Sequence, residues 1–257
     1  GTNGIVSVGT TGESATLNVY EHIDAIEHTV KYVNKRIPVI AGTGANSTQE
    51  AIDLSIEAKS KGADYTLLVT PYYNKPNQKG LIAHYEKIAD SVDMGHILYN
   101  VPSRTACDLK PETVDILSDH KNIVGVKDAT GDLDRVTQQK NKMGNDFIIL
   151  SGNDENTFEF NRLGGVGCIS VSANVAPQMC SEFHRLCNSK KFDEAKPIFD
   201  KLLPLHDVLF IESNPVPAKY SLSLMGMMTE DVRLPLVTAE NSSKEKIKEV
   251  LKNLSLI

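Results

Sequence analysis

The sequence contains no tryptophan, and no stretch of it is apolar over the roughly 18 residues that a membrane-crossing helix needs. The N-terminus also lacks the basic segment followed by an apolar segment that marks a secretory signal. Both absences argue against a membrane protein and against a secreted one. We therefore expect a cytoplasmic protein that does not bind a membrane.

Cysteine is scarce as well. The four cysteines form neither a CxxC pair nor a zinc-binding spacing. Cys180 and Cys187 are seven positions apart in a helix-like stretch, so a shared helical face explains them better than a disulfide. This usage is typical of a reducing compartment. The seven histidines show no HExxH or comparable spacing, so we expect no catalytic metal and no cofactor.

Blocks of one charge are also missing. The formal net charge is −6 at pH 7, and acidic and basic residues are interspersed. Nucleic acids and anionic membranes attract basic patches, so nothing in the sequence predicts either as a partner. The composition, 40% hydrophobic and 23% charged, is typical of a globular protein with a sizeable core. A chain of 257 residues forms one large α/β domain or two ordinary ones.

The sequence does contain many short apolar runs rich in β-branched residues. Because the runs are nearly continuous, they predict strands that are covered on both sides, as in a parallel sheet. Helical stretches lie between them, and Ser47 followed by Glu50 is typical of a helix start. The predicted strands are Ile5–Gly9, Pro38–Gly44, Tyr65–Pro71, His96–Pro102, Ile123–Ala129, Phe147–Asn153 and Gly167–Ala173. The helices predicted after the last strand lie around Pro177–Cys187, Phe192–Phe210, Val216–Leu224 and Ser243–Leu254.

The strand starts lie roughly 20 to 33 residues apart, which is the length of a strand–helix unit. Seven such units predict an α/β fold of the TIM (β/α)8 type without its first strand–helix unit, since a complete barrel has eight. Residues 1–173 would form the seven barrel units. Residues 174–257 would form the barrel-closing and C-terminal helical region, an appendage on the barrel. A doubly wound open sheet of seven strands is the alternative that periodicity leaves open.

One predicted strand carries a residue that does not suit a buried position. Lys127 lies in IVGVKDATG (Ile123–Gly131), just before that strand ends. It shares strand parity with Gly125, which leaves room for a long side chain, and Tyr99 lies at the matching level of the preceding strand. Burial disfavours an ammonium and favours the free amine, which attacks a ketone to form a Schiff base. An ion pair of Lys127 with Asp128 or with a neighbouring strand is the structural alternative.

Four motifs at predicted strand ends belong together: GTTGES (Gly9–Ser14), TPYYN (Thr70–Asn74), YNVPSRT (Tyr99–Thr105) and GVKDATG (Gly125–Gly131). The set resembles the dihydrodipicolinate synthase (4-hydroxy-tetrahydrodipicolinate synthase) family of the pyruvate-dependent class I aldolase superfamily. The resemblance extends from Gly1 to the C-terminus, and it implies a barrel that begins one strand and helix before Gly1. It also implies a lyase that condenses pyruvate with L-aspartate-4-semialdehyde through a Schiff base, at the entry to diaminopimelate and lysine biosynthesis.

The resemblance implies roles for single residues. Lys127 would form the imine with pyruvate, and Tyr99 would donate and accept protons. Thr11 would link Tyr99 to Tyr73, which is expected to reach the site of a neighbouring subunit in a homotetramer of two tight dimers. The substrate-binding residues would be Thr10 and Thr11 for the pyruvate carboxylate, Arg104 for the carboxylate of the semialdehyde, and Gly152 and Ile169 for the pocket wall.

In lysine-sensitive members of the family, L-lysine binds at the tight-dimer interface as an allosteric inhibitor. The positions that match this site are Ser14, Ala15, His22, Asn46, Glu50 and Tyr72. Two other functional interpretations stay open. One is a sibling pyruvate-dependent lyase, such as an N-acetylneuraminate or keto-sugar-acid aldolase, against which Arg104 in NVPSR argues. The other is a truncated form that keeps the site residues but is inactive.

Overall fold

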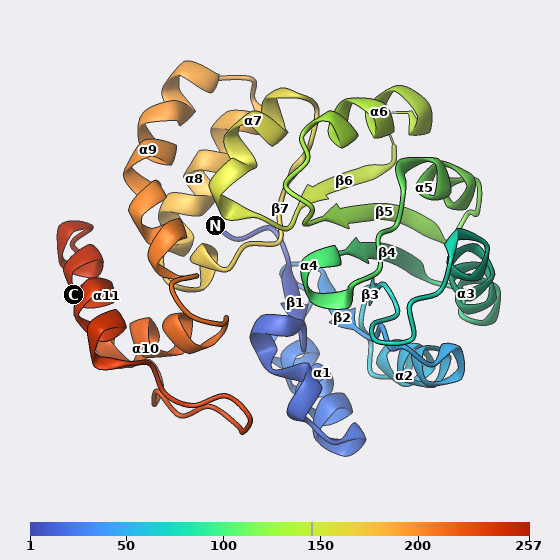
Figure 1. The fold of residues 1–257 in the computed structure, drawn as a ribbon, viewed down its shortest axis with the longest axis horizontal. Coiled ribbons are helices and arrows are strands. Elements are labelled where there is room, and N and C mark those ends of the chain that lie inside the picture. Colours follow the sequence, from blue (N-terminus) through green and yellow to red (C-terminus); the bar gives the residue numbers. More distant parts are fainter. Residues whose placement is uncertain (145) are drawn as a thin grey trace.

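A curled sheet of seven parallel strands forms the centre of the structure (Figure 1). In the computed structural model, which describes residues 1–144 and 146–257, each strand pairs with the next one along the chain. The strands are β1 (Ile5–Ser7), β2 (Val39–Gly42), β3 (Tyr65–Val69), β4 (Gly95–Asn100), β5 (Ile123–Asp128), β6 (Ile148–Ser151) and β7 (Gly167–Cys168). Because the order is sequential, the doubly wound alternative is wrong, since such a sheet reverses its strand order. Within the described residues β1 and β7 do not pair with each other, so the curled sheet is open on one side.

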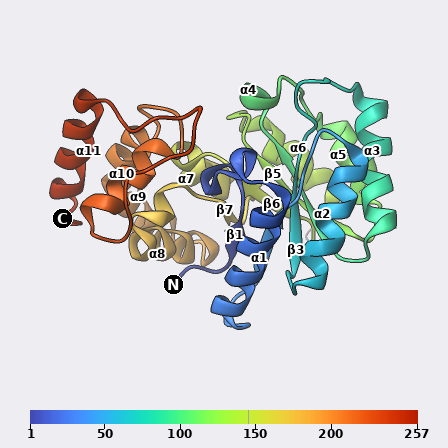
Figure 2. The same ribbon diagram turned by 90° about the horizontal axis from the view of Figure 1, so that it is seen from below.

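Helices connect the strands and cover the outer face of the sheet (Figures 1 and 2). They are α1 (Val19–Val33), α2 (Thr48–Ser60), α3 (Gln78–Ser91), α4 (Pro102–Thr105), α5 (Pro111–Ser118), α6 (Asp134–Met143) and α7 (Thr157–Arg162). The predicted start of α2 is confirmed, because the Ser47 hydroxyl accepts a hydrogen bond from the Glu50 amide at 3.4 Å. Helix α1 begins with a full capping box, in which Asn18 and Glu21 each accept from the other's backbone amide.

Four helices follow the last strand, as predicted. They are α8 (Pro177–Asn188), α9 (Phe192–Val208), α10 (Val216–Leu224) and α11 (Asn241–Asn253). These helices share a core of their own around Leu202, Leu205 and Leu251, all fully buried. Cys180 and Cys187 lie buried in α8 as free thiols, so the predicted shared helical face is confirmed. In the described part of the chain, no helix combines the length and the apolarity that crossing a bilayer requires.

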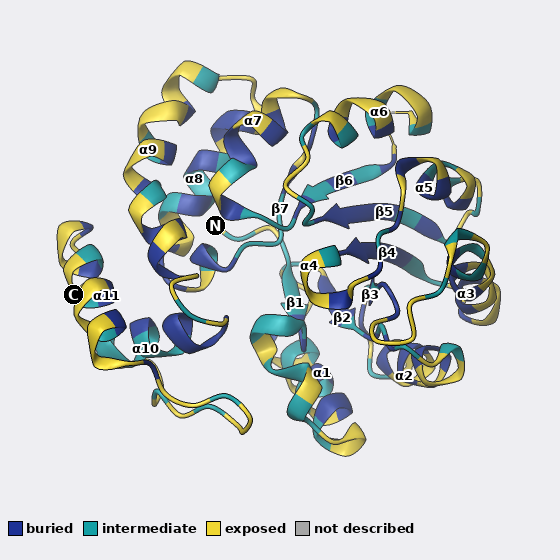
Figure 3. Cartoon of the chain, viewed as in Figure 1, coloured by how far each residue is buried: buried dark blue, intermediate teal, exposed yellow. Residues whose placement is uncertain are grey.

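The outer face of the strands is largely buried and the inner face is buried or half-buried, which explains the nearly continuous apolar runs (Figure 3). Leu68, Leu98 and Val126 point outward into the core that the sheet shares with α2, α3 and α5. Their neighbours of opposite parity, Leu67 and Ile97, belong to a smaller cluster on the inner face. Since side chains alternate along a strand, Tyr99 and Lys127 fall on that inner face as well.

The last strand is much shorter than predicted. Regular pairing of β7 stops at Cys168, whereas the apolar run suggested a strand as far as Ala173. The reason is a buried carboxylate, because Asp154 accepts hydrogen bonds from the backbone amides of Val171 at 2.8 Å and Ser172 at 3.2 Å. Those amides point at a side chain instead of a neighbouring strand, and the chain turns into the 3₁₀ turn η4 (Ser172–Asn174).

Candidate active site

The inside of the curled sheet encloses a cavity of about 1740 Å³ that reaches the loops after the strands. It exceeds the few hundred Å³ typical of a small-molecule site because it continues along the open side between β1 and β7. Most residues singled out from the sequence line it. They are Thr10, Thr11, Ser14, Ala15, His22, Glu50, Tyr72, Tyr99, Arg104, Lys127, Gly152 and Ile169. Tyr73 and Asn46 are the two that are not among the lining residues.

Lys127 and Tyr99 meet inside the sheet, as strand parity predicted. They are direct partners in the register of β4 with β5, and both side chains are buried. The Lys127 nitrogen lies 4.0 Å from the centre of the Tyr99 ring. Asp128 points to the opposite face of β5, where its carboxylate accepts from Thr130, and no ion pair of Lys127 is present among the described residues. The alternative of a Lys127–Asp128 ion pair is therefore not observed.

Room for the lysine comes from a different glycine than the sequence suggested. A Cβ on Gly125 would collide with the backbone of Ile148, at 2.5 Å from its oxygen, so this glycine allows close strand packing. A Cβ on Gly152 would lie 3.0 Å from the Lys127 Cε and 2.5 Å from the Ala129 Cβ. The absence of a side chain at Gly152 is thus what leaves space for the lysine.

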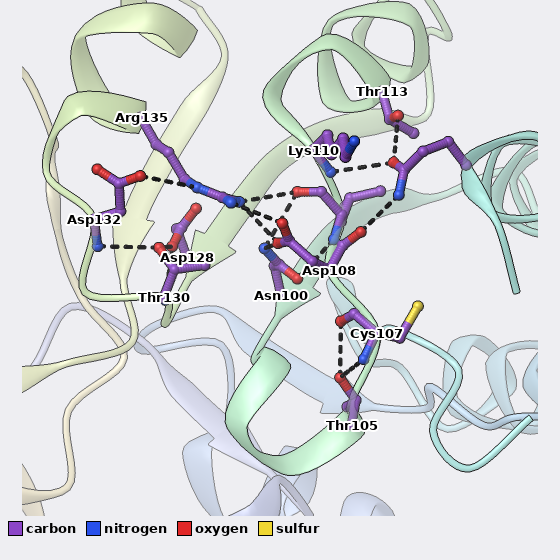
Figure 4. A network of polar contacts seen from close by, with 12 residues as sticks. Asn100, Thr105, Cys107, Asp108, Lys110, Thr113, Asp128, Thr130, Asp132 and Arg135 are labelled. Atoms are coloured by element: carbon purple, nitrogen blue, oxygen red, sulfur yellow. Dashed lines mark hydrogen bonds and ion pairs between the residues drawn. The ribbon is translucent and has the colours of Figure 1, made fainter. Parts of the chain in front are cut away.

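A polar network on the outer face holds the strand ends that carry this pair (Figure 4). Arg135 of α6 donates two hydrogen bonds to the Asp108 carboxylate, at 2.9 and 2.8 Å. Asp108 also accepts from Asn100, the last residue of β4, at 2.9 Å. Although burial alone would raise it, the hydrogen bonds from Arg135 and Asn100 hold the pKa of Asp108 below its usual range. The network fixes the outer side of β4, so that Tyr99 stays on the inner side.

The end of β5 is fixed in the same region. The Thr130 amide donates to one oxygen of Asp128 at 2.8 Å, and its hydroxyl donates to the same oxygen. The other Asp128 oxygen is buried without a partner among the described residues. Burial raises the pKa of Asp128 despite the two bonds from Thr130. The turn that follows Lys127 is therefore closed by its own side chains (Figure 4).

Thr10 and Thr11 lie in the 3₁₀ turn η1 (Thr10–Gly12), which follows β1. The Thr11 hydroxyl accepts a hydrogen bond from the Asn214 amide nitrogen at 2.9 Å. In the described residues, no hydrogen bond joins Thr11 to Tyr99 or to Tyr73. One chain therefore does not by itself assemble the relay of these three residues that the family resemblance implies.

Two of the predicted residues lie at the surface. Tyr73 is 89% exposed, and its backbone is in the left-handed region at φ 73°. Arg104 is exposed in α4, which directly follows β4, and it lines the mouth of the cavity. An exposed arginine at the edge of the cavity that Tyr99 and Lys127 also line can meet a carboxylate with its planar, two-pronged donor group.

The residues predicted for lysine binding lie around the starts of α1 and α2. His22 is buried, and its Nε2 donates to the Gly42 carbonyl at 2.7 Å, so that nitrogen is not free for an amine. Burial lowers the pKa of His22. Tyr72 is partly exposed, and burial followed by the Glu50 charge raises the pKa of its phenol. Asn46 donates to the Tyr72 carbonyl at 3.2 Å, which ties these residues together.

Asn214 was not predicted from the sequence as a functional residue. It lies 203 positions from Thr11, and no motif around it suggested a functional residue. The only local signal is an asparagine followed by a proline between two predicted helices, which is typical of many loops. In the described parts of the chain, no group of three or more histidines, cysteines or acidic residues is arranged to hold a metal ion.

Comparison with known proteins agrees with this geometry. Residues 1–254 match the Dihydrodipicolinate synthetase family. The chain is 52% identical to the 4-hydroxy-tetrahydrodipicolinate synthase of Pelagibacter ubique, over all of this chain and 89% of that protein. The crystal structure of a dihydrodipicolinate synthase from Acinetobacter baumannii complexed with pyruvate has a TM-score of 0.98 and 47% identity, over 100% of this chain and 88% of that one.

A more distant solved relative carries a second ligand. It is the dihydrodipicolinate synthase from Cyanidioschyzon merolae with lysine bound, at a TM-score of 0.97 and 34% identity, over 100% of this chain and 88% of that one. The curled sheet of this chain thus matches the TIM-barrel fold of these enzymes. The family match, the identity to the curated relatives and the shared fold all agree: the chain belongs to the dihydrodipicolinate synthetase family.

Proposed function

We propose that the protein is a 4-hydroxy-tetrahydrodipicolinate synthase, a class I aldolase-type lyase that condenses pyruvate with L-aspartate-4-semialdehyde. The observation that carries the proposal is the buried pair of Lys127 and Tyr99 at neighbouring strand ends. Relatives named 4-hydroxy-tetrahydrodipicolinate synthase match the whole length of this chain. They support aspartate semialdehyde as the second substrate, in preference to the substrates of a sibling pyruvate lyase.

In the proposed mechanism, the Lys127 amine attacks the ketone carbon of pyruvate and forms a C–N bond. The carbinolamine then loses water, and the product is an imine. Both steps move protons, and the Tyr99 phenol is the group within reach that can accept and return them. Thr10 and Thr11 hold the pyruvate carboxylate, and the backbone at Gly152 and Ile169 lines the opposite wall.

The second substrate enters from the mouth of the cavity. Arg104 binds the carboxylate of the semialdehyde there, because its guanidinium can donate two parallel hydrogen bonds. The imine loses a proton from the former methyl group of pyruvate and becomes an enamine, whose terminal carbon attacks the aldehyde carbon while the aldehyde oxygen takes up a proton. The amine of the semialdehyde then attacks the imine carbon, which closes the ring and releases Lys127 as a free amine for the next cycle. No metal ion and no cofactor is needed to balance these steps.

We further propose a homotetramer of two tight dimers, in which Tyr73 completes the site of the neighbouring subunit. Its 89% exposure and its place beside Tyr72 at the mouth of the cavity support this role. L-lysine would inhibit from the site around Glu50, Tyr72 and Asn46, as the lysine-bound relative suggests. The four free cysteines suit a cytoplasmic enzyme.

For the fold, we propose a (β/α)8 barrel in which an eighth strand lies between β1 and β7. The two unpaired strand edges and the continuation of the cavity between them support this arrangement. Residues 1–173 then form seven barrel units, and residues 174–257 form the helical region that packs beside them.

Trapping of the imine tests the proposed function. Borohydride added to the full-length protein with pyruvate should leave a reduced adduct on Lys127 that peptide mass mapping identifies. Lys127→Ala should abolish the adduct, whereas Lys121→Ala, an exposed lysine, should not. An adduct elsewhere, or full activity without an adduct, contradicts the mechanism. The rates of pyruvate condensation with aspartate semialdehyde and with N-acetylmannosamine are then compared. A synthase uses the semialdehyde, whereas an N-acetylneuraminate lyase uses N-acetylmannosamine.

A further inference from the structure

Residues from the C-terminal third of the chain hold the loop that carries Thr10 and Thr11. Figures 1 and 2 show the segment around α10 beside the loop between β1 and α1. The Asn214 amide nitrogen donates to the Thr11 hydroxyl at 2.9 Å. The Lys219 ammonium lies 2.7 Å from the Glu13 carboxylate, and the Arg233 backbone amide donates to the same carboxylate at 3.0 Å. The loop is therefore held by three contacts from one distant segment.

Glu13 explains why the loop needs these contacts. Its backbone is left-handed, with φ 55° and ψ 32°, at the junction of η1 and the next 3₁₀ turn, η2 (Ser14–Thr16). This conformation is unfavourable for a residue with a side chain. The Glu13 side chain is held in it by the Lys219 ion pair, in which both partners are more than four-fifths buried. Although burial alone would raise it, hydrogen bonds from Lys219 and the Arg233 amide lower the pKa of Glu13.

Of these three contacts, only the one from Asn214 reaches a residue that takes part in the proposed mechanism, which is Thr11. The Asn214 side chain is buried and lines the cavity, and its amide oxygen has no partner among the described residues. A hydroxyl has one proton to donate and two lone pairs that accept. Because the Thr11 oxygen accepts from Asn214, its own proton remains available for another acceptor.

We propose that Asn214 is a positioning residue of this enzyme, which fixes the Thr11 hydroxyl so that its proton is presented to the cavity. The inference rests on the proposed function, because it assigns Thr11 to the substrate carboxylate and the proton relay. The bond direction is what matters here. A group at position 214 that only accepts would take the Thr11 proton for itself.

The alternative is that Asn214 only stabilises its own loop. The amide of Val216 donates to the Ser213 carbonyl at 3.0 Å, so this turn has local support as well. In that case, a substitution at Asn214 would act on the fold and would be indifferent to the residue at position 11. A double-mutant cycle between the two positions separates the interpretations.

The test uses the full-length enzyme and the variant Asn214→Asp, whose carboxylate accepts and does not donate. We expect kcat to fall about tenfold, since one hydrogen bond to a reacting group is lost. In a Thr11→Val background, the same substitution should change kcat less than about twofold. Asn214→Ala gives a second cycle without an added charge. Asn253→Asp makes the same chemical change at an exposed residue of α11, outside the cavity lining, and should leave kcat unaltered.

Each result has one meaning. An equal loss from Asn214→Asp in both backgrounds overturns the proposal, because the effect then does not pass through Thr11. A loss in the wild-type background that comes with a matching fall in the melting temperature, and is repeated with Thr11→Val, overturns it too. If the wild-type enzyme forms no borohydride-trapped pyruvate adduct, the proposed function itself has failed, which is a different result from a failed cycle.

Discussion

The side-chain nitrogen of Lys127 lies 4.0 Å from the centre of the Tyr99 ring, and the two residues are direct partners in the parallel sheet. The face of the ring therefore packs against the end of the lysine side chain, which lies beside Gly152. The ring thus holds the lysine on the inner face of the sheet before a substrate arrives. The same ring carries the phenol that the proposed mechanism uses for proton transfer. The Tyr99 side chain would therefore both position Lys127 and exchange protons during its reaction.

Substitution of Gly152 should displace this pair. In Gly152→Ala the new methyl group would lie within 3.0 Å of the Lys127 Cε and 2.5 Å of the Ala129 Cβ. The lysine must shift, and a shift of about 1 Å at a reacting group costs on the order of a hundredfold in rate. We expect kcat to fall by that order while the circular dichroism spectrum is retained.

Gly4→Ala is the matched control for this prediction. A Cβ there would meet the Pro38 oxygen at 3.4 Å, an ordinary contact, and the position lies at the start of β1. It should leave kcat unchanged. Full activity of Gly152→Ala would show that the space beside Lys127 is not needed.

Mixing of two inactive variants tests whether Tyr73 serves a neighbouring subunit. Tyr73→Phe and Lys127→Ala should each be nearly inactive alone. When the two are unfolded and refolded together, half of the dimers are mixed, and one of the two sites in each mixed dimer has both residues intact. Activity should return to about a quarter of the wild-type level in a random mixture. No recovery, with mixed dimers present by native mass spectrometry, would place Tyr73 outside the neighbour's site.

The lysine site predicts a charge effect at Glu50. Its carboxylate lies near Tyr72 and His22, and a lysine ammonium would pair with it. Coupling between sites is typically about 1–3 kcal/mol, so lysine should inhibit the full-length enzyme. Glu50→Gln should raise the lysine concentration for half-inhibition about tenfold.

Initial rates against lysine measure this effect, with each variant referred to its own rate without lysine. Glu57→Gln is the control, since Glu57 is exposed further along α2. Equal sensitivity of the Glu50 and Glu57 variants, or no inhibition of the wild-type enzyme at millimolar lysine, would end the proposal of an inhibitory lysine site.

Buried histidines should make the protein sensitive to acid. Burial lowers the pKa of His84 from the usual 6.5 to about 4, and one ring nitrogen has no partner among the described residues. Between these two pKa values the unfolded chain binds more protons than the folded one, so stability falls as pH falls from about 6.5 to about 4. The loss is on the order of 3 kcal/mol, since one pKa unit corresponds to about 1.4 kcal/mol.

His84→Phe should weaken this dependence without abolishing it, because one of the groups that take up a proton on unfolding is gone, whereas burial also lowers the pKa values of His96 and His184 to about 4. Urea unfolding at pH 7 and pH 5 measures the difference in free energy of unfolding between the two conditions. His28→Gln, at an exposed histidine of α1, should retain the wild-type difference. An unchanged difference in His84→Phe would assign the acid sensitivity to other groups.

Most of the sheet could be predicted from the sequence, because apolar runs and their spacing are local properties. The pairing of Tyr99 with Lys127 followed from their places at the ends of neighbouring runs. The extent of β7 did not follow, because the Asp154 carboxylate that ends it comes from the loop after β6. The sequence also pointed to Gly125, and not to Gly152, as the residue that leaves room for the Lys127 side chain. Alternation along one strand can be predicted from the sequence, whereas contacts between neighbouring strands cannot.

The contacts of Asn214 and Lys219 with the loop after β1 could not be predicted for a similar reason. They join residues 203 and 206 positions apart. The hydrophobic pattern predicts where helices form, but it does not predict which loop the end of a helix will contact. Each partner taken alone has an ordinary explanation as a surface or loop residue.

The same separation sets an order of events during synthesis. A ribosome adds about 5–20 residues per second, so Asn214 is made about 10–40 s after Thr11. Through that interval the β1 strand and the helix behind it can emerge and fold, but the loop between them has none of its distant partners. A nascent chain therefore carries Thr10 and Thr11 without these contacts until residues 214–233 have been made, and the loop after β1 reaches its final position only when that distant segment packs against it.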